Sequence, residues 1–160
     1  FAIAGNLTVE QSPLTTLAGL NKLTSVGSVV VDRNAALTSL AALSNLTRVK
    51  SLTIRFNGSL TTLEGLNNLT RVGRDLVVKN HGALTTLEGL NNLTSVGGDL
   101  VVRINGALTS LAALSTLTRV GGDLVVNDNS VLPTNSAQAF ADRLIAGGFT
   151  GQVTIRANKP

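Results

Sequence analysis

The sequence contains no cysteine, methionine, tryptophan or tyrosine, and its single histidine is His81. With no cysteine, no second histidine and no nucleophile elbow, neither a catalytic triad nor a histidine-containing metal cluster can be assembled. No uninterrupted apolar run approaches the length of a membrane span. We therefore expect a protein that is not an enzyme, binds no cofactor and does not span a membrane.

Aromatic residues are also scarce, with only Phe1, Phe56, Phe140 and Phe149. Large aromatic side chains dominate tight protein interfaces, so their scarcity weakens a high-affinity receptor interpretation. The net charge is +4 and the sequence pI is about 10.4. Nucleic-acid binding would require aromatics or a recognition helix beside the basic residues, and neither is present. We expect no nucleic-acid partner, whereas attraction to an acidic polysaccharide or to other surface proteins stays open.

What the chain does have is a leucine or valine at every third position, in five runs. They begin at Leu14, Leu37, Leu60, Leu84 and Leu108 and end at Val26, Val49, Val72, Val96 and Val120. A period of three fits neither a packed helix nor a pleated strand, so each run should bend along the inside of an arc. Repetition at a fixed period predicts a solenoid, in which each turn buries its apolar side against its neighbours.

A short strand rich in β-branched residues precedes each arc and sets the register. Seven such segments begin at Leu7, Val29, Leu52, Leu76, Leu100, Leu124 and Val153. Their spacing predicts a mainly β fold, a parallel β-solenoid of seven rungs of about 24 residues. The first and third residues of each strand should point into the core and the second outward.

One polar residue recurs five positions after each strand start, where the chain turns. The set comprises Ser12, Asn34, Asn57, His81, Asn105, Asn129 and Asn158. A side-chain amide repeated once per rung can satisfy backbone groups at the corner, which avoids a penalty of about 1 to 3 kcal/mol per buried group. We expect a structural corner ladder, and we expect His81 to be one of its members rather than a base or a metal ligand.

The asparagine after each Leu-x-Val or Leu-x-Ile segment, the leucines at fixed offsets and the turns of about 24 residues resemble leucine-rich repeats. The run VGGDLVVRINGALTSLAALSTLTRVGGDLVV is more similar still to the receptor L-domain family, found in receptor ectodomains and in bacterial and fungal surface proteins. The resemblance extends from Ile3 to Asn158. It implies a right-handed β-solenoid that serves extracellular binding or surface architecture.

The sequence indicates a single domain, 1–160, because no linker or low-complexity segment divides it. The repeat breaks only in the last turn, at about 133–160, where a helix near 136–146 replaces the leucine arc. Thr134, Asn135 or Ser136 could cap that helix, and Gly147 with Gly148 would end it. The first residue is Phe1 and no basic and apolar leader precedes the repeats, so we expect a processed secreted form, extracellular or on a cell surface.

One aspartate column and two threonine columns suggest ligands. Asp75, Asp99 and Asp123 precede three successive strands and could share a calcium ion, although the neighbouring glycines favour a corner where aspartate bonds backbone amides. Two threonine columns also repeat once per turn, and they resemble the threonine arrays of ice-binding proteins. They comprise Thr15, Thr38, Thr61, Thr85 and Thr109, and Thr24, Thr47, Thr70, Thr94 and Thr118.

The ends of the coil favour a structural function. Neither end carries a recognisable polar cap, and an open solenoid end exposes strand edges and apolar side chains, here Leu7, Val9, Val153 and Ile155. We therefore expect a non-enzymatic structural protein that associates with itself head to tail, as an oligomer or filament.

The main alternative is a receptor-like ligand-binding or adhesion module, and ice binding is a third. The binding face would be the outward side of the strands, formed by Val30, Thr53, Val77, Val101 and Val125 and flanked by Arg55, Lys79 and Arg103.

Overall fold

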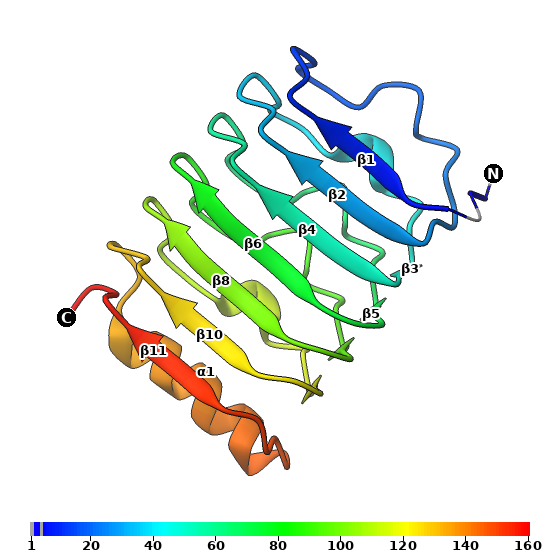
Figure 1. Cartoon of the computed structure of the whole chain (residues 1–160). Helices are drawn as coiled ribbons and strands as arrows, with labels where there is room; N and C mark the ends of the chain where they lie inside the picture. Colours follow the sequence, from blue (N-terminus) through cyan, green and yellow to red (C-terminus); the bar gives the residue numbers. More distant parts are fainter. Residues whose placement is uncertain (1, 4) are drawn as a thin grey trace.

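Seven parallel strands form the front of the protein in the computed structural model, which describes residues 2, 3 and 5–160 (Figure 1). They follow one another across the sheet in chain order: β1 (Leu7–Glu10), β2 (Ser28–Asp32), β4 (Ser51–Arg55), β6 (Leu76–His81), β8 (Leu100–Asn105), β10 (Leu124–Asn127) and β11 (Val153–Arg156). Each strand is joined to the next by an excursion behind the sheet. The predicted parallel β-solenoid is confirmed.

The strand register agrees with the sequence pattern. Leu52 pairs with Leu76, and Leu76 pairs with Leu100, so equivalent residues of successive rungs stack. In the central strands the first and third residues of each Leu-x-Val or Leu-x-Ile segment are buried, and the middle residue is half-buried on the outer face. The edge strands depart from this pattern, because each has only one neighbour: β1 has no fully buried residue, and Val153 in β11 is exposed.

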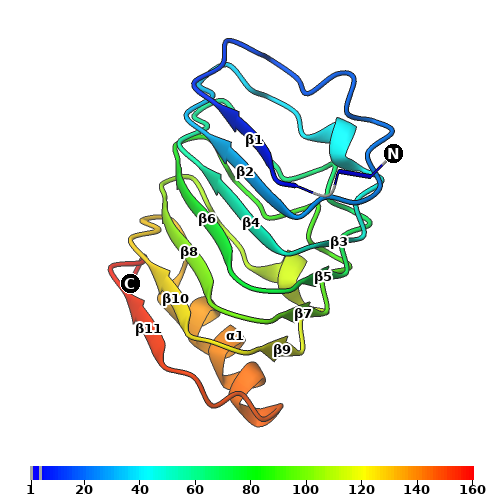
Figure 2. The same ribbon diagram turned by 45° about the vertical axis from the view of Figure 1, so that its right-hand side comes forward.

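A second parallel sheet runs beside the first, at the end of the leucine arcs (Figure 2). It consists of four two-residue strands in chain order: β3 (Arg48–Val49), β5 (Arg71–Val72), β7 (Ser95–Val96) and β9 (Arg119–Val120). Each valine is buried, and the residue before it faces outward. The sequence pattern did not predict this sheet.

The arcs themselves follow one of two paths. Leu-Ala-Ala-Leu arcs form the 3₁₀ turns η1 (Ala41–Leu43) and η2 (Ala112–Leu114). Leu-Glu-Gly-Leu arcs instead place Gly65 and Gly89 in the left-handed region, at φ +109° and +110°. A Cβ at Gly89 would collide with the carbonyl of Leu63 in the preceding rung. The glycine arcs therefore lie tightly against their neighbours.

One continuous core fills the space between the sheets and the arcs, and it consists almost entirely of leucine and valine. The arcs that begin at Leu37, Leu60 and Leu84 bury every one of their leucines completely or nearly so. The first arc differs, because among the described residues only Ala2 and Ile3 pair with it on its outer side, at Ser25 near its end. Leu14 is 49% exposed there, although Leu17 and Leu23 are buried.

The last connection is the helix α1 (Thr134–Ala146), which takes the place of an arc beside β11 (Figure 1). It buries Ala137, Phe140, Ala141 and Leu144 against the core. The helix begins two residues earlier than predicted. The expected cap by Thr134, Asn135 or Ser136 is wrong: Pro133 is the N-cap, and no side-chain hydrogen bond caps the helix. Proline is tolerated at this position because the carbonyl of an N-cap residue, and not its N–H, takes part in the first hydrogen bonds of the helix, here with the N–H groups of Ser136 and Ala137.

The helix also changes the number of turns. The sequence predicted seven rungs, and the structure has seven stacked strands but only about five complete turns of strand and arc. The difference arises because α1 replaces the sixth arc and no arc follows β11. In the part of the chain that the structure describes, no helix is long and apolar enough to cross a membrane.

Candidate functional site

The corner residues form a hydrogen-bonded ladder inside the solenoid, and all of them except Ser12 are buried. Asn105 is representative. Its Nδ2 donates to the carbonyl of Val78, at 3.1 Å, and to Oδ1 of Asn129, at 3.3 Å. The backbone N–H of Asn105 also donates to Asn129 Oδ1, at 3.0 Å. Each interior amide thus satisfies backbone groups of its neighbouring rung, as a side chain with both a donor and an acceptor can.

His81 occupies one position of this ladder and makes equivalent contacts. Its Nε2 lies 3.1 Å from the carbonyl oxygen of Ile54, and the N–H of Asn57 donates to Nδ1 at 3.3 Å. Nδ1 also lies 3.1 Å from the carbonyl oxygen of Asn57, so each ring nitrogen has a backbone carbonyl to which it can donate. Burial lowers the pKa of His81, although the backbone carbonyls of Asn57 and Ile54 partly oppose that shift. The histidine is enclosed within the core and is not accessible to a substrate.

A residue in the left-handed conformation precedes every ladder position. The seven residues are Gln11, Arg33, Phe56, Asn80, Ile104, Asp128 and Ala157, with φ between 47° and 60°. This single residue turns the chain from the strand into the corner. This position could not be predicted from the sequence, because most of these residue types are not ones that favour the left-handed region.

No element of the described part of the chain lies over the outer face of the seven-stranded sheet (Figure 1). The predicted binding-face residues Val30, Thr53, Val77, Val101 and Val125 run down its centre and are all half-buried. Arg55, Lys79 and Arg103 form the adjacent column, in register with one another. The structure therefore brings the residues of the predicted face together.

Two acidic residues neutralise much of this column. The Asp32 side chain is only 2% exposed, and its Oδ2 accepts hydrogen bonds from Arg33 and Arg55, each at 2.9 Å. Arg33 also lies over the ring of Phe56, with 5.0 Å between its Cζ and the ring centroid. Arg103 pairs with Asp128 at 3.4 Å. The centre of the face is thus mostly apolar, and its margin is only partly neutralised, because Lys79 forms no ion pair within the described residues.

The aspartate column at the other margin supports the backbone. Oδ1 of Asp75 accepts the N–H of Asp99 at 2.9 Å, and Oδ1 of Asp99 accepts that of Asp123 at 2.8 Å. Oδ1 of Asp123 in turn accepts the N–H of Gln152. Among the described residues, no group of three or more histidine, cysteine, aspartate or glutamate side chains could hold a metal ion. The geometry gives the calcium alternative no support.

The threonine columns also bond within the solenoid. The hydroxyls of Thr70, Thr94 and Thr118 each donate to the backbone carbonyl of the threonine one rung earlier, at 3.0 to 3.3 Å. Thr85 and Thr109 do the same in the other column. Their hydroxyl hydrogens therefore point along the stack.

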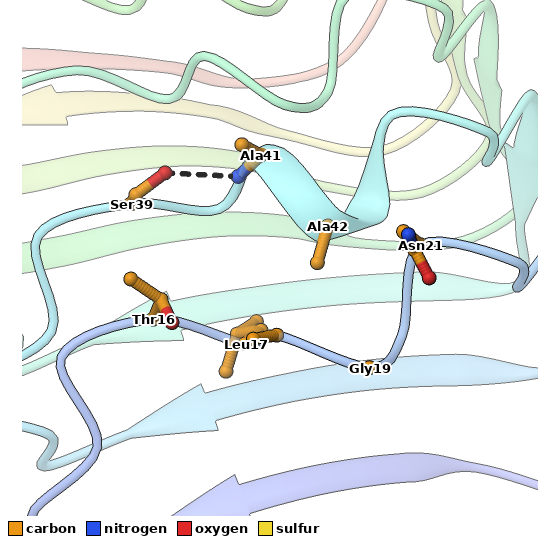
Figure 3. Close-up of a pocket in the computed structure, with 8 residues that line it drawn as sticks. Thr16, Leu17, Gly19, Asn21, Ser39, Ala41 and Ala42 are labelled. Carbon is orange, nitrogen blue, oxygen red and sulfur yellow. Dashed lines mark hydrogen bonds between the residues drawn. The ribbon is translucent and has the colours of Figure 1, made fainter.

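A shallow hollow of about 330 Å³ lies between the first arc and η1 (Figure 3). Ala42 points from η1 toward the first arc, where Leu17 and Gly19 lie, and Ser39 Oγ accepts the N–H of Ala41 at 3.1 Å. No ionisable side chain lines this hollow. The hollow forms between the 3₁₀ turn η1 and the first arc, which turns at Gly19. Its lining does not indicate a ligand.

The two ends of the long sheet are unlike the interior. Leu7, Val9 and Ile155 are only half-buried and Val153 is exposed, so the predicted end residues all lie on strands with a free edge. Two further end residues, Glu10 in β1 and Arg156 in β11, follow them in register and were not predicted. The strand alignment contains the signal, because each lies three residues after its strand start.

No family model, curated protein or solved structure matches the chain.

Proposed function

We propose that this chain is a non-enzymatic structural module of the extracellular space or cell surface that associates with itself head to tail. In this joint, β11 of one copy pairs with β1 of the next in the parallel register that the interior strands use. The resemblance to leucine-rich repeats and receptor L domains supports the extracellular setting. The uncovered strand edges support the mode of association, since an unpaired edge can accept a further strand.

The observation that carries this proposal is the match between the two edge strands. Continuing the register sets Leu7 opposite Val153, Thr8 opposite Thr154 and Val9 opposite Ile155. It also sets Glu10 opposite Arg156, and both side chains are exposed and form no ion pair within the described part of the chain. Apolar residues thus meet apolar residues, and opposite charges meet at the margin.

The helix adds a second contact. Because a helix is about 10 Å wide and successive rungs are about 4.8 Å apart, α1 extends beyond the plane of the last strand. An incoming copy would place its first arc against α1. The two most exposed large apolar side chains among the described residues lie on these elements, Leu14 on the arc and Ile145, 50% exposed, on α1.

Sedimentation velocity over a range of concentrations, together with electron microscopy, tests this association. The unmodified protein should form oligomers or filaments that grow with concentration. Ile155→Lys should abolish them while the circular dichroism spectrum stays unchanged, because a buried lysine at the joint would lack a partner. A protein that stays monomeric at high concentration, without filaments, would refute the proposal.

Charge exchange tests the register itself. Glu10→Arg and Arg156→Glu should each weaken the joint by about fivefold, because like charges face each other across paired strands. The double variant should restore it. Lys79→Glu is the matched control, since Lys79 occupies the same column in the middle of the sheet. If the double variant assembles no better than the single ones, β11 does not pair with β1 in this register.

A receptor-like or adhesion function is the second candidate, and the uncovered outer face of the sheet favours it. Replacing Val77 and Val101 by lysine should leave folding nearly unchanged and abolish any binding to a surface partner. Ice binding ranks third, because the threonine hydroxyl hydrogens are already bonded to backbone carbonyls.

A further inference from the structure

The second sheet carries a column of arginines with one interruption. Arg48, Arg71 and Arg119 are the exposed first residues of β3, β5 and β9, whereas Ser95 holds this position in β7. The register aligns Arg71 with Ser95 and Ser95 with Arg119. The two arginines on either side of the serine are therefore two strand spacings apart, about 9.6 Å between backbones, and only a small hydroxyl lies between them.

This interruption opens a hollow. A cavity of about 390 Å³ lies over Ser95 and is lined by both flanking arginines, Thr94, Thr118 and the backbone of Gly73 and Gly97. Gly97, which lines this cavity, must remain glycine, because a Cβ there would collide with the carbonyl of Gly73 in the preceding rung. A second hollow of about 530 Å³ shares Thr118 and Arg119 with the first and continues to Gly147, Gly148 and Thr150 after α1. Together they form a groove along the stacking direction, which we call the arginine groove. Its lining includes residues of β7 and β9, whose backbones are labelled in Figure 2.

The arginines of this groove are not neutralised. All three ion pairs among the described residues involve Asp32 or Asp128, at the margin of the other sheet. No carboxylate lines either hollow. Asp75 and Asp99 lie outside both hollows, directly before strands β6 and β8 of the long sheet. Each has one oxygen bonded to the backbone of the next rung. The groove therefore concentrates uncompensated positive charge.

The donors also have a suitable arrangement. The hydroxyls of Thr94 and Thr118 donate to backbone carbonyls, so they cannot donate outward. The Ser95 hydroxyl forms no such bond and can donate into the hollow. Each guanidinium offers a planar set of N–H groups that matches the oxygens of a carboxylate or sulfate. An anionic group over Ser95 can thus be held from both sides and from below.

We propose that the arginine groove binds a linear acidic polysaccharide, with one carboxylate or sulfate group seated over Ser95 between Arg71 and Arg119. The groove is long and open at the surface, which suits a chain rather than a compact ligand. Nucleic acid fits less well, because single strands are held largely by stacking on several aromatic rings. Phe149 is the one aromatic residue lining either hollow, and it is half-buried against the core.

Binding to immobilised dextran sulfate and polygalacturonate at low ionic strength tests this site, with neutral dextran as the blank. Both acidic polymers should bind and the neutral one should not, and added salt should weaken binding by screening. Arg71→Gln and Arg119→Gln should each weaken binding by about tenfold. Arg48→Gln is the matched control: Arg48 is exposed in the same column but does not line either hollow, so its loss should matter less.

The variant Ser95→Arg distinguishes binding that depends on the shape of the hollow from binding that depends only on the net charge of the protein. It completes the arginine column and fills the hollow, so it should weaken binding by about fivefold although it adds a positive charge. Tighter binding by this variant, or an equal loss from Arg48→Gln and Arg71→Gln, would overturn the proposal. Circular dichroism of each exposed-residue variant establishes that the fold is retained.

Two further probes identify the source of the anion. Free sulfate at millimolar concentration should compete weakly with the polymers. If sulfate alone binds as tightly as dextran sulfate, the ligand is a small anion and not a polysaccharide. If a single-stranded oligonucleotide binds more tightly than both acidic polymers, the groove is a nucleic-acid site and the proposal is wrong.

Discussion

The first turn and the middle turns of the solenoid share the same sequence repeat, yet equivalent residues in them have different surroundings. Leu14 and Leu60 begin equivalent arcs, and the first is 49% exposed while the second is fully buried. Gly19 and Gly89 have similar left-handed backbones, but only Gly89 lies against a carbonyl of a preceding rung. In a solenoid, burial is therefore conferred on a residue by the rungs on either side and not by its own segment.

The largest expected difference concerns the leucines that begin the arcs. Leu60→Ala should lower the free energy of unfolding by about 3 to 5 kcal/mol, because it opens a cavity in a fully packed core. Leu14→Ala should cost about 0.5 kcal/mol or less in the monomer. Urea denaturation at low protein concentration measures both. Similar costs would show that Leu14 is covered in solution.

The glycines separate two causes of strain. Gly89→Ala should cost about 3 kcal/mol, since it adds both left-handed strain and a collision with the Leu63 carbonyl. Gly19→Ala should cost only about 1 kcal/mol, because a Cβ there meets no atom within 4 Å. Thermal melts of the two variants compare them. An equal effect would indicate that the backbone conformation alone accounts for the glycine.

The corner ladder offers a third contrast. Asn105→Ala should cost about 1 to 3 kcal/mol, because it leaves the buried carbonyl of Val78 and the backbone N–H of His81 without partners. Ser12→Ala should cost less than about 0.5 kcal/mol, since the Ser12 hydroxyl only accepts one bond, from the exposed N–H of Leu14. Chemical denaturation decides this, and a large loss from Ser12→Ala would contradict it.

The smallest expected effect is a pH dependence that the first turn lacks. Because burial lowers the pKa of His81 in the folded protein, the neutral imidazole stabilises the fold fully above about pH 6.5, the unfolded value. As the pH falls below that, the unfolded chain binds a proton that the folded chain excludes, and stability falls by at most about 1.4 kcal/mol per pH unit.

Denaturation between pH 7.5 and about pH 5 tests this effect. His81→Asn should be neutral or stabilising at pH 7, and it should have a flatter pH profile than the unmodified protein. If the two profiles are parallel, His81 is not the titrating group.

The sequence predicted the parts of the fold that depend on repetition. The short segments rich in β-branched residues, five that begin with leucine and two that begin with Val29 and Val153, placed all seven strands of the long sheet, and the break after Leu132 placed the helix. It could not predict β3, β5, β7 and β9, because two residues are too short to show a strand period. Nor could it predict the left-handed column, since Gln11, Phe56 and Ile104 carry no turn signature.

The candidate sites, too, could be predicted only in the parts that follow from the sequence repeat. The outward face could be derived from alternation along the strands, which fixes the side on which each residue lies. The burial of Asp32 could not, because it depends on Arg55 reaching across from the next rung. The arginine groove was also missed, since it depends on a serine where neighbouring rungs have arginine and on the register of a sheet that the pattern did not reveal.

The ladder of amides has a direction. The backbone N–H of Asn34 donates to Oδ1 of Asn57, that of Asn105 donates to Asn129, and that of Asn129 donates to Asn158, always toward the next rung. The side-chain Nδ2 groups of Asn34, Asn105 and Asn158 donate the opposite way, to carbonyls of the preceding rung. The first and last rungs of the stack therefore present different sets of donors and acceptors. A filament of such copies would be polar, with all subunits pointing the same way, and its two tips would differ chemically and elongate at different rates.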